Sequence, residues 1–493
     1  MIKAKKLICL GLTVVMTASL LTGCGKKPTE RVSTTGFVDV DTETEMTLSY
    51  CYWQDRKIVS ELIEDFQEKY PNIKVEDLGQ DSTDGYNENL TNLSAAMNLP
   101  DVFWLLGECD FAIENGMLYD MSPMWEADED TKNVLSTINS LKLGYFGTDA
   151  KWTTPVKYFP DTIFANKALF ESTNHKMPDK DWTWEDMKKS IEEMCFINND
   201  GKRIYGYNDY RTIITWYPVA ADADCIGEFG WNGTEFNFTY WADALKQQAD
   251  WIKGEVHAPT DTAVLEELYG SSEWVASQGV VAYQFDSWWT WNNLFSRDEY
   301  ITKNVIYVPY IIPHTADNQS SEKFIATMDF GGISAATKHP REAYEVLKFM
   351  TWGAEGWNKK LEHFKELEEQ AKTDKTIDVT TLCNNLPLCD DKSVWDKYKA
   401  EFLPSDDDEY GRGEWFSYYM DHIKEPIPYG GQQIPGFTSF LQENYDKYNE
   451  VGVHSWAVDQ GNDPHDLVDE LTKIANQKNK ERLDEINQML ITN

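Results

Sequence analysis

The sequence lacks the short motifs that mark the common classes of enzyme. It contains no GxGxxG turn, no Walker A loop, no GxSxG nucleophile elbow and no HExxH metal motif. It also contains no CxxC pair and no zinc-like spacing of Cys and His. We therefore predict no cofactor and no metal site.

Positive charge is scarce. The chain holds 45 Lys and Arg against 83 Asp and Glu, which gives a formal net charge of −38. Such a surface repels the phosphates of nucleic acids. We therefore exclude a nucleic-acid partner and expect a soluble body outside the cell.

Long apolar runs are confined to the start of the chain. Three lysines precede an uncharged apolar run over residues 7–21, a pattern typical of a secretory signal and too short for a permanent membrane span. The run ends in Leu-Thr-Gly-Cys, which resembles the lipobox of bacterial lipoproteins. The resemblance implies that a signal peptide, residues 1–23, is removed and that Cys24 is lipidated. The alternative is an ordinary signal peptide with a cysteine there by chance.

The residues after the lipobox are mostly polar. Residues 24–45 are rich in Lys, Pro, Thr, Ser and Gly, a composition typical of a disordered tether. No later segment approaches 18 uncharged apolar residues, so the lipid on Cys24 would be the only membrane anchor. These features predict a protein held by lipid on the extracytoplasmic face of the cell membrane.

Six cysteines remain beyond Cys9 and Cys24. An even number in an exported protein permits disulfides, but the sequence does not rank their possible pairings. A chain of this length needs no disulfides for stability, so we assign none.

Strand and helix patterns alternate through the body of the chain. The β-prone residues 46–53 precede a helical stripe of Ile58, Leu62 and Phe66, and a second strand pattern follows Pro71. Strand, helix and strand in so short a stretch indicate a right-handed βαβ unit. The pattern predicts an α/β fold with mostly parallel sheets.

Seven segments, in order, resemble the extracellular solute-binding proteins of sugar ABC importers, the broad group that includes maltose-binding protein. They are YCYWQD…FQEKYPNIKVE, LPDVFWL…ENGMLYDMSP, TTPVKYFPDTIFANKALF, MPDKDWTWEDMKKSIEEM, SQGVVAYQFDSWWTWNNL, VIYVPYIIP and GGISAATKHPREAYEVLKFM. Together they cover residues 46–360. The resemblance implies a two-lobed, type II periplasmic-binding-protein-like fold with the ligand cleft between the lobes.

The resemblance also implies how the chain divides into lobes. The crossing points are expected near Lys157 and near Tyr300. Residues 361–430 match the family poorly, which predicts an insertion in the second lobe. The expected boundaries are lobe 1, residues 46–157 and 300–360, and lobe 2, residues 158–299 and 361–493.

By this resemblance the chain is no enzyme. It would bind a carbohydrate, expected to be an oligosaccharide, and deliver it as a monomer to the transmembrane subunits of an ABC permease. Such a cleft needs flat apolar faces for sugar rings and carboxylates or amides for hydroxyls. Two alternatives use the same side chains. A surface-anchored hydrolase would pair carboxylates such as Asp286 and Glu108, and a non-transport sugar sensor or adhesin would share the fold and the ligand.

Three tryptophans fall within the segment FDSWWTWNN. Adjacent residues of a helix or strand point in different directions, so at least one indole should face away from the core. The resemblance places Trp289 at a sugar-stacking position, with Asp286 and Trp288 beside it, and Trp291 in the core. For Trp288 a core position is an equal alternative.

The other candidate ligand-binding residues follow predicted strands, because open α/β sheets bind ligands at the strand tips. They are Trp53, Asp55, Trp104 and Glu108 in lobe 1, and Asp161 and Arg211 in lobe 2. Trp53 could instead lie in the core, and Asp55 could instead cap the following helix. Arg211 could form a surface ion pair, or could hold a uronate if it faces the cleft.

Overall fold

Nine strands form the frame of the described part of the chain. The computed structural model describes residues 39–107, 109–136, 139, 150–209, 213–315, 318, 325–379, 382–423 and 434–492. The strands are β1 (Met46–Cys51), β2 (Ile73–Asp77), β3 (Val102–Leu105), β4 (Thr154–Asn166), β5 (Phe196–Ile197), β6 (Arg203–Asp209), β7 (Val281–Ser287), β8 (Tyr307–Tyr310) and β9 (Ala326–Ile333). They follow the order β2-β1-β3-β9-β4-β7-β6-β5, and β8 also pairs with β4.

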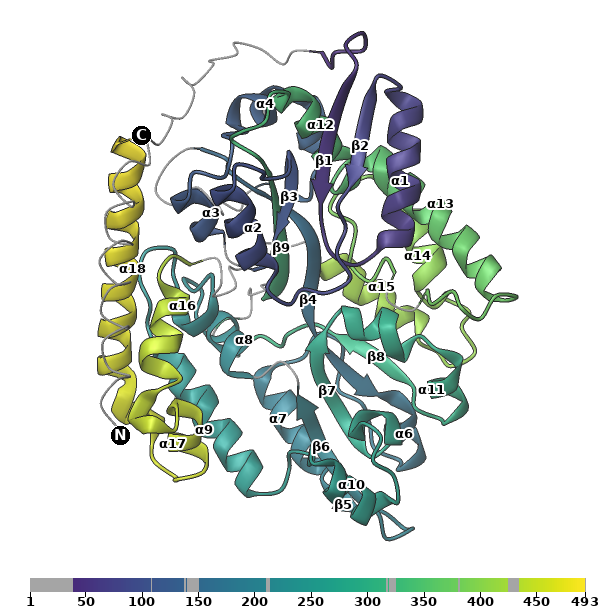
Figure 1. Ribbon diagram of the computed structural model, residues 1–493. Coiled ribbons are helices and arrows are strands. Elements are labelled where there is room, and N and C mark those ends of the chain that lie inside the picture. The colour runs from purple at the N-terminus through teal and green to yellow at the C-terminus, as the bar shows by residue number, and fades with distance from the viewer. Residues whose placement is uncertain are drawn as a thin grey trace, which may run out of the picture.

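Strand β4 connects the two lobes. Through Pro160 it pairs with β9, whereas from Asp161 onward it pairs with β7 and β8. Strands β1, β2 and β3 extend the β9 side, and β6 extends the β7 side. In Figure 1 the first group lies in the upper lobe, the second in the lower lobe, and β4 runs between them. The predicted two-lobed α/β fold is confirmed.

The parallel pairs are those that the strand–helix pattern indicates. They are β1–β2, β1–β3 and β6–β7. All antiparallel pairs except β5–β6 involve β4 or β9, because these two strands cross between the lobes in opposite directions. Helix α1 (Arg56–Lys69) follows β1 and buries the predicted stripe of Ile58, Leu62 and Phe66.

Helices cover both lobes. Helices α1, α12 and α13 pack together on lobe 1, and α8, α9 and α17 pack together on lobe 2. Among the described residues, no helix is both long enough and apolar enough to span a bilayer. The helices used below are α3 (Asp110–Glu114), α8 (Ile213–Ala221), α9 (Thr239–Lys253), α11 (Asp298–Thr302), α12 (Pro340–Met350), α13 (Ala354–Ala371), α14 (Lys392–Phe402), α15 (Gly413–His422), α16 (Phe437–Phe440), α17 (Val453–Val458) and α18 (Val468–Thr492), the 3-10 turn η1 (Glu129–Asn133) and the π-helical turn η4 (Trp291–Phe295).

The chain returns to lobe 1 later than the sequence predicts. Tyr300, expected near the second crossing, lies in α11, and the following strand β8 still pairs with the lobe 2 half of β4. The crossing strand is β9. The predicted end of lobe 1 at residue 360 is also too early. Residues 361–371 were expected in lobe 2, but they belong to helix α13, which packs against α1 and α12 of lobe 1.

The predicted tether ends before residue 45. Residues 1–38, including Cys24, lie outside the described residues. Asp41 donates its backbone N–H to Glu342 (3.0 Å), and the Asn72 amide donates to the carbonyls of Asp41 (2.8 Å) and Thr44 (2.9 Å). Residues 39–45 therefore dock on lobe 1 instead of belonging to the tether.

The predicted insertion covers one face of the crossing strand. The Tyr158 hydroxyl donates to the carbonyl of Ile423 (3.1 Å), and the Thr162 hydroxyl lies 2.6 Å from that of Tyr419 on α15. The ring of Trp288 stacks on Tyr419 with centroids 5.3 Å apart. The insertion thus packs against residues on both sides of the crossing point.

Replacing Trp291 tests the packing of the insertion on lobe 2. Its indole is buried, donates to the carbonyl of Phe402 (2.9 Å) and packs on Phe416 of α15 with centroids 4.2 Å apart. We expect Trp291→Ala to lower the free energy of unfolding by about 3–5 kcal/mol, because a large buried ring leaves a cavity. Urea denaturation measures this loss. Ile197→Ala, at an exposed position of β5, is the control and should change stability by less than about 0.5 kcal/mol. A loss below about 1 kcal/mol for Trp291→Ala would contradict the packing.

Candidate functional site

The two faces of β4 have different surroundings. Side chains alternate between the faces of a strand. Tyr158 and Thr162 contact the insertion, so Lys157, Phe159 and Asp161 lie on the opposite face. We take this second face, at the crossing between the lobes, as the candidate site.

Trp289 belongs to the second face. Its ring meets that of Phe159 edge to face, with centroids 5.3 Å apart. Trp289 is half-buried, whereas Trp288 and Trp291 are fully buried. The neighbouring indoles of Trp288 and Trp289 therefore lie in different surroundings, with Tyr419 against Trp288 and Phe159 against Trp289. Trp291 packs in the core as expected, and Trp288 takes the core alternative.

The two candidate carboxylates of lobe 2 lie on opposite faces of the sheet. The register pairs Asp161 with Ser287 and Asp286 with Thr162, and directly opposed residues share a face. Asp286 therefore shares the face of Thr162, which the insertion covers. Its carboxylate accepts from the Gln284 amide (3.1 Å) and from the backbone N–H of Ser287 (2.8 Å). Asp161 therefore shares the face of Phe159, which contacts Trp289, whereas Asp286 does not.

The lobe 1 candidates form an aromatic cluster at the tips of β1 and β3. Trp53 meets Trp104 edge to face at 5.1 Å and Tyr86 at 4.8 Å between ring centroids. Both tryptophans are buried. The ammonium of Lys157 lies 5.6 Å from the Trp104 ring centroid, close enough for a cation–π contact. Trp53 therefore lies in the core, which is the alternative that the sequence analysis left open for it.

Asp55 is held by two lysines. Its buried carboxylate lies 3.4 Å from Lys157 and 3.7 Å from Lys360 of α13. Asp55 occupies the position before α1, but its side chain makes no capping hydrogen bond. It also has a left-handed backbone, as does Gln54, with φ of 53° and 60°. Two such residues in succession are unusual outside glycine, and strain of this kind clusters at ligand sites.

Two candidates lie outside the described residues. These are Glu108 and Arg211. In the sequence, Glu108 comes after β3 and Arg211 comes after β6.

Sequence reasoning missed Lys157 and Phe159 as site residues. Lys157 marked only a lobe boundary, and Phe159 was not singled out. The spacing Lys157, Phe159, Asp161 contains the signal, because alternate residues of a strand share a face. An ammonium, an aromatic ring and a carboxylate on one face can hold polar and flat parts of one ligand at once.

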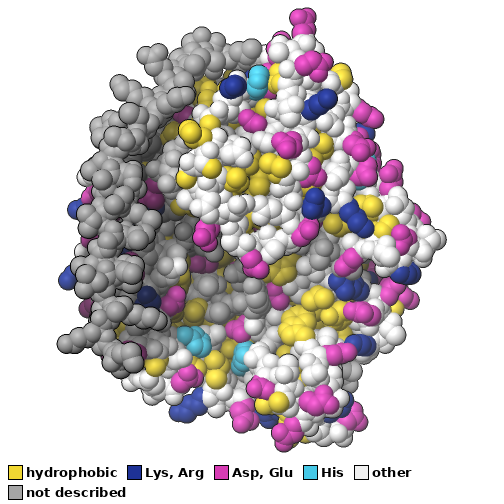
Figure 2. All heavy atoms as spheres, in the orientation of Figure 1, with side chains coloured by type: hydrophobic (Ala, Val, Ile, Leu, Met, Phe, Trp, Pro, Cys, Tyr) yellow, Lys and Arg dark blue, Asp and Glu magenta, His cyan; other side chains and the backbone are white. Residues whose placement is uncertain are grey.

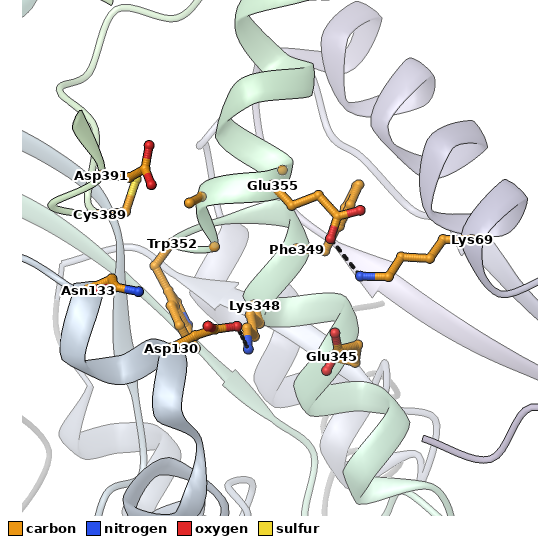
Figure 3. Close-up of a pocket in the computed structure, with 13 residues that line it drawn as sticks. Lys69, Asp130, Asn133, Glu345, Lys348, Phe349, Trp352, Glu355, Cys389 and Asp391 are labelled. Carbon is orange, nitrogen blue, oxygen red and sulfur yellow. Dashed lines mark hydrogen bonds and ion pairs between the residues drawn. The ribbon is translucent and has the colours of Figure 1, made fainter. Parts of the chain in front are cut away.

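A separate cavity of about 300 Å³ lies on lobe 1, between η1, the α12–α13 turn and residues 389–391. Figure 3 shows Glu355 turned toward Lys69 and Asp130 turned toward Lys348. Lys69 pairs with Glu355 (2.6 Å) and Lys348 with Asp130 (2.5 Å). None of the predicted site residues lines this cavity.

Metal ligands, cysteines and surface charge point to no further site among the described residues. Over the described ranges, no three or more His, Cys, Asp or Glu side chains are arranged to hold a metal ion. No disulfide joins any of the six cysteines beyond the predicted lipobox. Figure 2 shows Asp and Glu side chains scattered over the visible face of both lobes, so the negative charge there does not mark one site.

The fold and the site together define a class. Two α/β lobes share a crossing strand, and aromatic and charged side chains meet where the strand passes between them. This is the architecture of two-lobed solute-binding proteins, whose ligands lie between the lobes.

The family follows from the sequence. The profile of the bacterial extracellular solute-binding protein family matches residues 52–351. The chain belongs to this family. A search of curated proteins finds no match.

Solved structures share the fold at low identity. An ABC substrate-binding protein from Listeria monocytogenes, in complex with cycloalternan, is 17% identical over 90% of this chain and 99% of its own, with a TM-score of 0.56. The sugar-binding protein MalE from Xanthomonas citri is 14% identical over 89% and 98%, with a TM-score of 0.59. A periplasmic oligogalacturonide-binding protein from Yersinia enterocolitica is 14% identical over 89% and 100%, with a TM-score of 0.57.

Asp329 on β9 gives the crossing region a pH dependence. Burial raises the pKa of Asp329 from 3.8 to about 6, although Lys157, directly opposite on β4, and a backbone hydrogen bond with Gly107 lower it. Between these two values the folded protein keeps a proton that the unfolded chain has released. Stability therefore falls as pH rises through this window.

Asp329→Asn should remove this loss of stability with rising pH. Between about pH 4 and pH 7 the stability of the variant relative to the parent should rise by up to about 3 kcal/mol. Urea denaturation at several pH values measures the difference, and Asp200→Asn, at an exposed turn, is the control. If variant and parent have parallel pH profiles, Asp329 does not titrate in this window.

Proposed function

We propose that this family member captures a carbohydrate, expected to be an oligosaccharide, and delivers it to an ABC permease. The observation that carries the proposal is the half-buried ring of Trp289 beside Phe159 at the crossing strand, on the same face as Asp161. A flat ring stacks on the C–H face of a sugar, and a carboxylate accepts hydrogen bonds from its hydroxyls.

Other residues have supporting roles in this proposal. Trp104 and Trp53 form the aromatic wall of lobe 1, and the paired Asp55 and Lys157 keep polar groups at the strand tips. Glu108 and Arg211 are proposed to add a carboxylate and a guanidinium from the segments after β3 and β6. The ligands named for solved structures of the same fold, including cycloalternan, mannotriose and oligogalacturonide, are carbohydrates, which supports this ligand class.

The alternative of a surface-anchored hydrolase would pair Asp286 with Glu108, and the position of Asp286 on the strand face that the insertion covers weighs against that pair. No observation favours a sensor or adhesin over a transport component. Permease genes beside the coding sequence would support transport. We also propose that the protein acts as a monomer, anchored by lipid at Cys24 on the extracytoplasmic face of the membrane.

Trp289→Ala tests the binding site. We expect about thirtyfold weaker binding, because an aromatic anchor contributes about 2 kcal/mol or more to a complex. Calorimetry with neutral and uronic oligosaccharides of two to four sugar units measures the affinity, and an assay for new reducing ends on the parent tests for hydrolysis. Trp274→Ala is the matched control, since Trp274 is another half-buried tryptophan of lobe 2, stacked on Phe295. Unchanged affinity in Trp289→Ala would show that the sugar binds elsewhere. New reducing ends would show that the protein is an enzyme.

Cys24→Ala tests the anchor. The variant should fold and bind sugar like the parent, but should leave the membrane fraction, because the lipid would be the only anchor. Detergent-free fractionation of cells followed by detection of the protein measures this. A variant that still sediments with membranes would show that another segment holds the protein there.

A further inference from the structure

The last helix of the chain packs against both lobes. Helix α18 has 25 residues and, at 1.5 Å per residue, is about 37 Å long. It contacts α16 on the side of lobe 2 and α3 of lobe 1. In Figure 1 it runs along the left edge beside both lobes. The sequence placed this whole region in lobe 2.

The first half of α18 is fixed to lobe 2. The Asn476 side chain accepts from the backbone N–H of Phe236 (2.6 Å) and donates to its carbonyl (3.1 Å). The Thr472 hydroxyl accepts from the N–H of Phe238 (3.2 Å). Leu471, the residue before Thr472, is fully buried. These contacts make the first half of the helix part of lobe 2.

The second half of α18 reaches lobe 1. Arg482 forms an ion pair with Glu114, the last residue of α3. The two side chains keep only 18% and 28% of their exposure. Ile486 lies one turn further on the same face of the helix and is fully buried. Helix α3 follows β3 closely in the chain, so α18 touches lobe 1 at the helix that comes after the end of β3.

This contact lies far from the crossing strand. In Figure 1, β4 runs near the middle of the molecule and α14 and α15 lie to its right, whereas α18 lies at the left edge. When two lobes rotate about crossing strands, atoms far from the strands move furthest. Opening the lobes would therefore separate Arg482 from Glu114 while the contacts at β4 changed little.

We propose that α18 is a latch, in which Arg482 and Glu114 join the lobes in the arrangement described here and must part before the lobes open, so that they slow the release of the ligand. The proposal deepens the proposed function and rests on it. Arg482 is a positioning residue in this role, since it acts through the lobe arrangement and does not need to touch the sugar. A contact that must break before the lobes open lowers the dissociation rate of the ligand.

Removing the ion pair tests the latch. Arg482→Gln and Glu114→Gln should each raise the dissociation rate of a bound oligosaccharide about two- to fivefold, the effect of one partly exposed ion pair. The double variant should be no faster than either single variant, because both remove the same contact. The exchanged pair, Arg482→Glu with Glu114→Arg, is made together with Glu485→Gln, because Glu485 lies 3.3 Å from Arg482 and would repel a carboxylate at that position. It should restore the rate of Glu485→Gln alone. Stopped-flow tryptophan fluorescence measures the rates.

Lys478→Gln is the matched control. Lys478 lies on α18, like Arg482, and pairs with Glu443 (2.5 Å). Glu443 belongs to the π-helical turn after α16, on the side of lobe 2. This variant should keep the parent rate. The latch is overturned if Lys478→Gln accelerates release as much as Arg482→Gln, if the exchanged pair fails to restore the rate, or if the two single effects add.

A second measurement separates the latch from the proposed function. If no oligosaccharide binds the parent, the proposed function fails, but hydrogen exchange on the unliganded protein still tests the latch. Arg482→Gln should speed exchange of the backbone amides in α3 and in the last turns of α18, and Lys478→Gln should not. Equal exchange in the parent and Arg482→Gln would overturn the latch without reference to any sugar.

Discussion

The backbone hydrogen bonds of β4 hold both lobes, and the rest of the architecture depends on them. All of its residues are buried, so its backbone groups must be paired within the protein. They pair with β9 as far as Pro160 and with β7 and β8 beyond it. The lobes therefore cannot separate without breaking a sheet, but they can rotate if the backbone angles of β4 and β9 change at the crossing. A shared strand makes each lobe rigid and confines movement to a few residues.

The alternation of side chains along β4 separates stability from binding. One face carries Tyr158 and Thr162, which anchor the insertion, and the other carries Phe159 and Asp161. The same geometry places the adjacent indoles of Trp288 and Trp289 in different surroundings, one in the core and one half-exposed. A slip of one residue in the register of β4 and β7 would exchange the two sets. Tight packing by the insertion on one face is thus a condition for the site on the other.

Several charged side chains are buried together near the crossing, and they compensate one another. Asp55 lies between two lysines, and Lys157 also bonds Gln54 (3.1 Å) and faces Asp329. Removing one partner from such a group leaves an uncompensated buried charge. The segments that supply these groups come from β1, β4, β9 and α13, so the cluster ties residues from distant parts of the sequence to the crossing point. The left-handed Gln54 and Asp55 lie in the same cluster, where packing from several elements can hold a strained backbone.

The sequence by itself determined the α/β class, the helical stripe of Ile58, Leu62 and Phe66, and the fact that three tryptophans so close together cannot all face one way. These are local properties, since periodicity and alternation depend on neighbouring residues. Only the tertiary structure decided which tryptophan is half-exposed, because that depends on α15, more than a hundred residues later. It also decided that Asp286 lies on the face of the insertion, that α13 belongs with lobe 1 and that α18 reaches α3. Strand register and the packing of distant helices decide these points, and neither leaves a pattern in a local stretch of sequence.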